Sequence, residues 1–431
     1  MLLRRLIFGI TLLATCVAPL QARLTIEITE GQEGALPIAI VPFHWGGGGE
    51  PPEQLSEVVR ADLARSGQFA PLPLDQLPAR PQQGQRIDFS TWRERQIDNL
   101  VVGRLVPADG AFMVQFQLFD VLTGEQLAGY NIPALPTQLR QAAHRISDII
   151  YQTLTGQRGA FNTHVAYITV SKGSDGQRRY QLAVADADGY NEQIILTSAQ
   201  PLMSPAWSPQ GRQLAYVSFE EGRPTVFVQN IITGAREQVA AFEGINSAPA
   251  WSPDGQRLAL TLSRDGNPEI YILELASRRL QRITNNYAID TEAVWSPDGD
   301  ALIFTSDRGG VAQLYRAALD GSRPQRLTFD GRYNARASWS PNGQLLALVH
   351  RAESGYVIGL QPATGGAVRP LSQNRLDESP SFAPNGSMVI YATEVNGRGV
   401  LEVAAVEGSA RQRLTLLHGD VREPAWSPYI D

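Results

Sequence analysis

Cysteine and lysine are almost absent from this chain of 431 residues. The one cysteine, Cys16, lies inside an N-terminal apolar run, so the rest of the chain cannot form a disulfide. The one lysine, Lys172, lies far from the tetraglycine Gly46–Gly49. A phosphate-binding P-loop needs a lysine at the end of its glycine-rich turn, and the sequence therefore excludes one. We interpret the tetraglycine as a flexible connection before a helix.

The signatures of several enzyme classes are also missing. No Gly-x-Ser-x-Gly elbow of an α/β-hydrolase occurs, and Gly173-Ser-Asp-Gly176 has the wrong spacing, which counts against a peptidase or a peptidoglycan hydrolase. The histidines lack the spacing of metal ligands, and we interpret all five as structural or surface residues: His44, His144, His164, His350 and His418. The sequence predicts no enzyme and no cofactor.

The charge of the chain is modestly negative. Lys and Arg number 37 against 43 Asp and Glu, which gives a formal net charge of −6, and no block of basic residues occurs. This balance excludes nucleic acid as a partner. Beyond the N-terminal run no apolar stretch approaches the length of a membrane span, so we expect no span in the mature chain.

The first 22 residues read as a secretory signal peptide. Arg4 and Arg5 precede the apolar run Leu6–Ala18, and Pro19–Ala22 resembles the small-residue cleavage site, which would make Arg23 the mature N-terminus. Residues 13–16 loosely resemble a lipoprotein cleavage box. Threonine is a poor residue before an acylated cysteine, and we prefer an ordinary signal peptide.

A short phrase returns along the rest of the chain at intervals of 43 or 44 residues. A period in the forties, with strand-like runs and turns inside each unit, is the signature of a β-propeller with four-stranded blades. Six copies predict six blades over residues 161–431. The copies begin at Trp207, Trp251, Trp295, Trp339, Phe382 and Trp426, and all but the Phe382-Ala-Pro copy read Trp-Ser-Pro.

The two ends of the repeat region complete each other. The runs Val165–Val170, Tyr180–Ala185 and Gln193–Thr197 read as three strands with no such phrase before them. The missing innermost strand is supplied by Pro424–Pro428. We therefore predict that the C-terminal strand closes the ring, which removes a free sheet edge. The repeat tryptophans are expected to pack between blades.

Residues 23–160 predict a small α/β domain. Its strands and helices are expected at Pro37–Phe43, Glu53–Ser66, Asn99–Arg104, Phe112–Asp120, Gln126–Ile132 and Thr137–Leu154. Ahead of them, Arg23–Ile28 alternates in polarity. Two interpretations stay open for it: an edge strand, or a detachable segment that pairs elsewhere.

Two positions in each repeat vary in a way that suggests a site. We expect both to reach one mouth of the central channel, as a solvated rim or as a receptor for a peptide or loop. A cation among Asp290, Glu292, Asp377 and Glu378 is a further hypothesis. The position five residues before each aromatic holds Leu202, Asn246, Asp290, Asn334, Asp377 and Val421, and the position three before holds Ser204, Ala248, Glu292, Arg336, Ser379 and Glu423.

Several phrases in the chain would not be reproduced by generic propeller repeats: Ile38-Ala-Ile-Val-Pro-Phe43, Asp188-Gly-Tyr-Asn191, Pro201-Leu-Met-Ser-Pro-Ala-Trp-Ser-Pro209, Leu376-Asp-Glu-Ser-Pro380, Ala383-Pro-Asn-Gly386, Met388-Val-Ile-Tyr391 and Pro424-Ala-Trp-Ser-Pro-Tyr429. On these phrases the whole chain resembles the TolB family, the periplasmic propellers of the Tol–Pal system.

The resemblance implies a non-enzymatic periplasmic protein, expected to be a monomer. It implies binding of the lipoprotein Pal at the channel mouth and of the C-terminal domain of TolA at the N-terminal strand. These contacts would support outer-membrane integrity and constriction of the envelope in cell division. Other Tol-system and outer-membrane proteins, and translocation segments of colicins, are further partners that it implies. The alternative is a secreted propeller that binds glycan or peptide ligands.

Two sets of residues carry these expectations. The family pattern is looser around Asn334–Arg336, and the N-terminal segment keeps the family's alternation but not its side chains. The Pal-binding mouth comprises Met203, Ser204, Asn246, Ala248, Asp290, Thr291, Glu292, Arg336, Asp377 and Glu378, and the TolA-contacting strand comprises Arg23, Leu24, Thr25, Ile26, Glu27 and Ile28.

Overall fold

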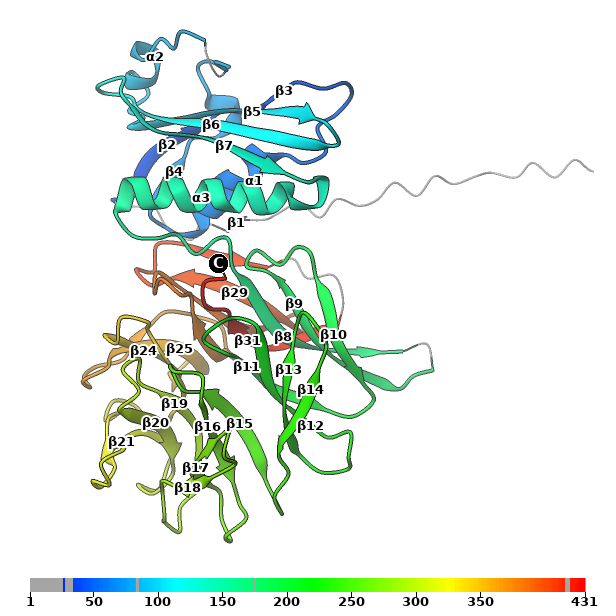
Figure 1. Cartoon of the computed structure of the whole chain (residues 1–431). Coiled ribbons are helices and arrows are strands. Elements are labelled where there is room, and N and C mark those ends of the chain that lie inside the picture. Colours follow the sequence, from blue (N-terminus) through cyan, green and yellow to red (C-terminus); the bar gives the residue numbers. More distant parts are fainter. Residues whose placement is uncertain (1–25, 28–33, 83–84, 174, 415–418, 431) are drawn as a thin grey trace, which may run out of the picture.

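The computed structural model describes residues 26–27, 34–82, 85–173, 175–414 and 419–430. They form an α/β domain that lies against a ring of six β-sheets, as the fold class predicted (Figure 1). The predicted signal peptide and His418 lie outside the described residues. Within the described residues, no helix is long and apolar enough to cross a membrane.

A mixed six-stranded sheet is the centre of the N-terminal domain. Its order is β4-β2-β5-β6-β7, and β3 also pairs with β5. The elements are β2 (Leu36–Ile40), β3 (His44–Trp45), α1 (Leu55–Arg65), β4 (Phe69–Pro71), η1 (Leu74–Gln76), α2 (Ser90–Arg93), β5 (Asn99–Ala108), β6 (Ala111–Asp120), β7 (Gln126–Ala134), η2 (Pro136–Gln138) and α3 (Leu139–Thr155).

Apolar residues at successive positions of β2 and β5 explain why both faces of this sheet are covered. Ile38 and Val101 face one way and pack under α1 and α3. Ala39 and Leu100 face the other way and pack against Trp92 of α2. Side chains at successive strand positions point to opposite faces, so two buried faces require a nearly continuous apolar run.

Each propeller blade is a four-stranded antiparallel sheet whose innermost strand carries the repeated phrase. Blade 1 holds β11 (Leu202–Trp207), β12 (Gln213–Ser218), β13 (Thr225–Asn230) and β14 (Arg236–Ala240). Blade 2 holds β15 (Asn246–Trp251), β16 (Arg257–Leu262), β17 (Glu269–Glu274) and β18 (Leu280–Arg282). Blade 3 holds β19 (Asp290–Trp295), β20 (Ala301–Ser306), β21 (Gln313–Ala318) and β22 (Gln325–Arg326).

The other three blades complete the circle. Blade 4 holds β23 (Asn334–Trp339), β24 (Leu345–Arg351), β25 (Tyr356–Pro362) and β26 (Arg369–Pro370). Blade 5 holds β27 (Glu378–Phe382), β28 (Met388–Val395), β29 (Arg398–Ala405) and β30 (Arg411–Arg413). Blade 6 holds β31 (Asp420–Trp426), β8 (His164–Lys172), β9 (Arg178–Asp186) and β10 (Gln193–Ser198).

The predicted closure of the ring is confirmed. Strand β31 pairs antiparallel with β8, with Asp420 opposite Val170 and Trp426 opposite Val165. Blade 6 is therefore assembled from two segments at opposite ends of the propeller sequence. Because β31 is the innermost strand of this blade, it also supplies one-sixth of the channel wall.

The tryptophans pack between blades, as predicted, and three of them also hydrogen-bond to the neighbouring blade. The indole N–H of Trp251 donates to the Ala206 carbonyl at 3.2 Å, and that of Trp295 donates to the Ala250 carbonyl at 3.1 Å. Trp207 closes the circle by donating to the Ala425 carbonyl of β31 at 3.0 Å. Each of these bonds joins the innermost strands of neighbouring blades and so fixes the distance between them.

The two domains share one apolar core. Tyr151 of α3 and Phe161 of the connecting segment belong to the same buried cluster as Trp426 and Met388 of the propeller. The side-chain amide of Gln157 also donates to the Asn385 carbonyl of blade 5 at 2.6 Å. A continuous apolar interface makes the two domains one packed body.

The segment Arg23–Ile28 is described only at Ile26–Glu27, which forms β1. Here the backbone pairs antiparallel with β30, with Ile26 opposite Gln412 and Glu27 opposite Arg411. Strand β1 therefore extends the outer edge of blade 5 and does not join the sheet of its own domain.

Removing residues 422–431 should open the ring. The truncation deletes most of β31, exposes the edge of β8 and removes the buried Trp426. Loss of that one side chain alone costs about 3–5 kcal/mol in a typical core. We expect a melting temperature at least 10 °C lower and a wider urea transition, with the milder variant Trp426→Phe falling between. A truncated chain that melts like the full chain would contradict ring closure as the source of stability.

Candidate functional site

All six innermost strands carry the same irregularity. In each, the pairing with the second strand shifts register around the residue three before the repeat aromatic. That residue has a positive φ between 47° and 57° although none of the six is a glycine. The residues are Ser204, Ala248, Glu292, Arg336, Ser379 and Glu423.

These bulges determine what lines the channel. A bulge inserts one residue without a partner and bends its strand, which re-aims the side chain. All six bulge residues line a channel cavity of about 470 Å³ that continues along the Trp-Ser-Pro segments. Positive φ is strained for residues with a side chain, and a strained residue that recurs at one place in each blade indicates a functional constraint.

Arg336 crosses this channel. Its Nη2 donates to Oε2 of Glu423 at 2.8 Å, and its Nε lies 3.9 Å from Oε1 of Glu292. The same oxygen of Glu423 accepts the backbone N–H of Ser204 at 2.7 Å. Groups from blades 3, 4, 6 and 1 thus meet in one polar network, which we call the cross-channel tie.

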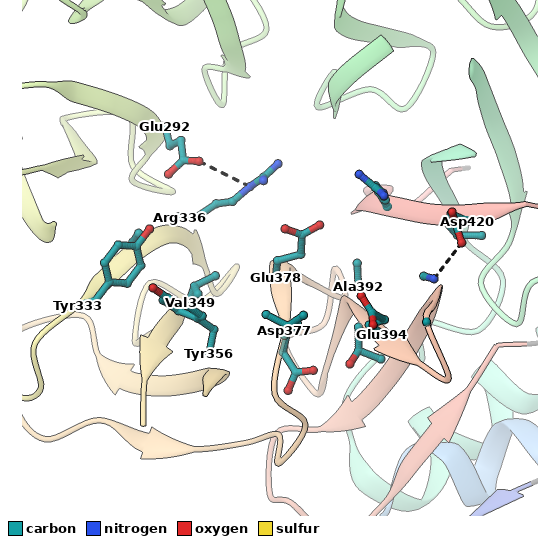
Figure 2. Close-up of a pocket in the computed structure, with 17 residues that line it drawn as sticks. Glu292, Tyr333, Arg336, Val349, Tyr356, Asp377, Glu378, Ala392, Glu394 and Asp420 are labelled. Atoms are coloured by element: carbon teal, nitrogen blue, oxygen red, sulfur yellow. Dashed lines mark hydrogen bonds and ion pairs between the residues drawn. The ribbon is translucent and has the colours of Figure 1, made fainter. Parts of the chain in front are cut away.

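A second cavity of about 510 Å³, here called the mouth cavity, opens beside the tie over blades 4 to 6. Glu292 and Arg336 line both cavities, so the tie forms the boundary between them. Figure 2 shows Glu378 and Asp420 on the walls, with Tyr333 and Tyr356 on the side of blade 4. The two rings pack edge to face with centroids 5.3 Å apart. Most charged residues of this wall are acidic, and its two cations are Arg336 and Arg422.

The structure does not bring all the predicted mouth residues into the lumen. Asn246 and Asp290 are fully buried and line neither cavity. Asn246 bonds the backbone of Phe242, and Asp290 accepts a hydrogen bond from Arg308 at 2.7 Å. Asn246 thus closes the loop between blades 1 and 2, and Asp290 anchors the turn between β20 and β21 of its own blade.

Asp377 is also buried, although it borders the mouth cavity. Its carboxylate accepts a hydrogen bond from Ser372, and burial raises its pKa above the usual range. Figure 2 shows this carboxylate directed away from Glu378. The four acids that suggested a cation therefore do not converge on one point. The polar residues five before the aromatic, Asn246, Asp290, Asn334 and Asp377, are buried, whereas all six residues three before it line the channel cavity.

The remaining predicted residues do reach the lumen. Met203, Ser204, Ala248 and Thr291 line the channel cavity, Glu378 lines the mouth cavity, and Glu292 and Arg336 line both. The sequence analysis missed the mouth residues Tyr333, Tyr356, Glu394 and Asp420. Glu394 and Asp420 lie outside the two repeated positions, Tyr333 lies on the loop before β23, and Tyr356 begins the third strand of blade 4, so the repeat gave no signal for them.

Exposed apolar side chains surround the same end of the propeller. Tyr287 is 90% exposed and Phe329 is 72% exposed, on the loops that lead into β19 and β23. Ile245, Ile289 and Leu376 lie at equivalent places before β15, β19 and β27 and are also exposed. Large exposed apolar groups gathered near one opening are typical of a protein-binding surface.

A second polar cluster lies at the domain interface. Nδ1 of His144, on α3, is 2.7 Å from Oδ2 of Asp62 on α1, and its Nε2 is 3.5 Å from Oδ2 of Asp188 in the propeller. Arg140 binds the same Asp188 oxygen at 2.5 Å, and Arg65 donates to Oδ1 of Asp62 at 2.9 Å. All five side chains are at most 12% exposed.

The geometry of this cluster fits a proton better than a metal. The ligand atoms of Asp62, His144 and Asp188 lie within 4.8 Å of one another, close enough to share an ion. Both carboxylates, however, already bind an arginine. Burial disfavours a charged imidazole, but the two carboxylates outweigh it and raise the pKa of His144 to about 9. A protonated His144 therefore joins the domains as a fixed cation.

Each of the two domains matches a known family model. Residues 24–127 match the family model of the TolB amino-terminal domain, and residues 151–430 match that of the TolB beta propeller domain. The chain belongs to the TolB family. The Tol-Pal system protein TolB of Thioalkalivibrio sulfidiphilus is 63% identical over 425 residues, which are 97% of this chain and 98% of that protein. The protein of the same name from Nitrosococcus oceani is 62% identical over 94% of both chains.

A solved TolB shares the architecture. The crystal structure of TolB from Acinetobacter baumannii matches with a TM-score of 0.86 and 42% sequence identity, over 94% of this chain and 100% of that one. Identity and coverage at this level place both domains of the chain within the TolB fold.

The His144 cluster should make the free energy of unfolding fall at alkaline pH. The folded pKa of about 9 lies above the ordinary value of 6.5, so the stabilisation is complete below pH 6.5 and is lost as the pH rises through 9. The full effect is as much as about 3 kcal/mol. Urea unfolding at pH 6.5, 7.5, 8.5 and 9.5 should show this decline in the wild type and a flatter dependence in His144→Gln. Parallel curves for the two proteins would contradict the assignment.

Proposed function

We propose that the chain is a non-enzymatic periplasmic component of the Tol–Pal system that binds the lipoprotein Pal at the channel mouth and the C-terminal domain of TolA through Arg23–Ile28. These contacts would maintain outer-membrane integrity and support constriction of the envelope in cell division. The observation that carries the proposal is the match to proteins named Tol-Pal system protein TolB over nearly the whole chain.

The form of the mouth supports Pal as its ligand. A cavity with acidic and tyrosine walls lies next to exposed apolar side chains such as Tyr287 and Phe329. Protein interfaces combine a few aromatic anchors with a polar, solvated rim. A folded domain could rest on the loops and insert one segment into the mouth cavity. The same arrangement would accept a disordered colicin segment.

The pairing of β1 supports the N-terminal segment as the TolA contact. Its described part makes only two residue pairs with β30, at the edge of blade 5. So short a pairing costs little to break, and a released strand can add to the sheet edge of another protein. We infer that the segment alternates between blade 5 and TolA.

Charge reversal at the mouth should weaken binding of Pal. Calorimetric titration of residues 23–431 with a soluble Pal domain should give at least a tenfold lower affinity for Glu378→Arg and for Glu292→Arg, since both side chains line the mouth cavity. Glu378 is exposed, so its variant should keep the wild-type melting temperature. Glu125→Arg, the same change in an exposed turn of the N-terminal domain, is the control. Unchanged affinity in both mouth variants would place the Pal site elsewhere.

Removal of the N-terminal segment should separate the two activities. A chain that starts at residue 34 lacks β1 but keeps every residue of the mouth. We expect it to lose calorimetric binding to the C-terminal domain of TolA and to bind Pal within a factor of about three of the longer chain. Retained TolA binding in the shortened chain would contradict the role of Arg23–Ile28.

A further inference from the structure

Arg336 is held at the boundary between the two cavities from both sides. It extends from β23 of blade 4 and reaches Glu423 of blade 6, passing over blade 5, while Glu292 of blade 3 lies behind its Nε. Glu292 is itself fixed by the Thr305 hydroxyl, which donates to Oε2 at 3.2 Å. Both carboxylates are thus positioned by further bonds, and they determine where the guanidinium lies.

The Arg336 guanidinium stays protonated in this position. Burial opposes it, but the carboxylates of Glu423 and Glu292 outweigh burial and raise the pKa of Arg336. A guanidinium has five N–H donors in a rigid plane, and the tie uses Nη2 and Nε. Among the described residues, none accepts a hydrogen bond from Nη1. Figure 2 shows the side chain extending past Glu292 into the open lumen, above Glu378.

We propose that Arg336 determines the specificity of the channel mouth by donating Nη1 to an oxygen acceptor at the tip of the inserted partner segment. This proposal rests on the proposed function, in which the mouth binds Pal. The acceptor is a carbonyl or carboxylate oxygen, because the guanidinium offers donors alone. Segments that present a cation or an apolar group at this depth would leave the donor unpaired and bind less tightly.

The charges around the tie explain why a preorganised donor matters here. Glu378, Glu394 and Asp420 make most of the mouth cavity acidic and would repel a carboxylate in the absence of Arg336. Arg336 and Arg422 are the two cations of this wall, and Arg336 favours an oxygen acceptor at the depth where the tie holds its guanidinium. Because Glu292 and Glu423 hold the side chain in place, a ligand does not have to order it on binding.

The experiment separates recognition from stability by exchanging the charges of the tie. The double variant Arg336→Glu, Glu423→Arg keeps an ion pair between blades 4 and 6 but moves the donor to the other wall. Arg336→Met removes the donor and keeps an apolar stem of similar length. Arg323→Met is the matched control, since Arg323 is exposed in the turn between β21 and β22, at the opposite end of blade 3. Calorimetric affinity for the soluble Pal domain and the melting temperature are measured for each.

We expect Arg336→Met to lower the affinity at least tenfold and the charge exchange to lower it as much while the melting temperature stays within 2 °C of the wild type. Arg323→Met should change neither quantity. Wild-type affinity in both Arg336 variants would overturn the proposal, reduce Arg336 to a structural tie and leave Pal binding intact. If the exchanged protein is unstable, Arg336→Lys decides: an ammonium has no rigid planar fork that binds Glu423 with one nitrogen and holds another at a fixed depth for the ligand, and full affinity in that variant would also overturn the proposal. A wild-type chain that does not bind Pal would instead refute the proposed function itself.

Discussion

The pairing of β31 with β8 is the constraint on which the rest of the structure depends. It converts six sheets in a row into a closed circle, and the indole bonds of Trp207, Trp251 and Trp295 then hold neighbouring innermost strands at a constant separation. Only at a fixed radius can Arg336 reach Glu423 across the lumen. The tie in turn divides the interior into two cavities with different walls.

The repeat unit made the propeller predictable, because one phrase marks the innermost strand of every blade and its spacing counts the blades. The longer N-terminal elements also followed from apolar periodicity, although η2 takes the first turn predicted for α3. The short elements β3, β4, η1 and α2 were not predicted. The backbone conformation of the innermost strands could not be predicted in the same way. Glycine is the usual sequence signal for positive φ, but here Ser, Ala, Glu and Arg adopt it, so no residue type pointed to the bulges. Positions five and three before each aromatic therefore looked alike, and only the structure separates buried Asp290 from Glu292 in the lumen.

The cluster at the domain interface was hidden for a different reason. His144, Asp62 and Asp188 come from two helices and a propeller turn, so no local spacing connects them. Their pairing can be recognised only after the domains have packed. The two polar networks also differ in kind. At the interface each carboxylate has a buried arginine and the charges are fixed, whereas at the mouth the Glu378 carboxylate and Nη1 of Arg336 still face open space and can bind a partner.

The chain's single lysine lies where it can be labelled selectively. Lys172 is exposed at the end of β8, two residues past the pairing of Val170 with Asp420 on the mouth wall. Apart from the α-amine of the N-terminus, an amine-directed fluorophore would therefore attach only to this side chain, next to the opening of the lumen. With no cysteine after residue 16, a thiol introduced anywhere else would accept a second dye independently. Residue composition and ring geometry together make this propeller a natural scaffold for two-colour distance measurements between the mouth and any other point on its surface.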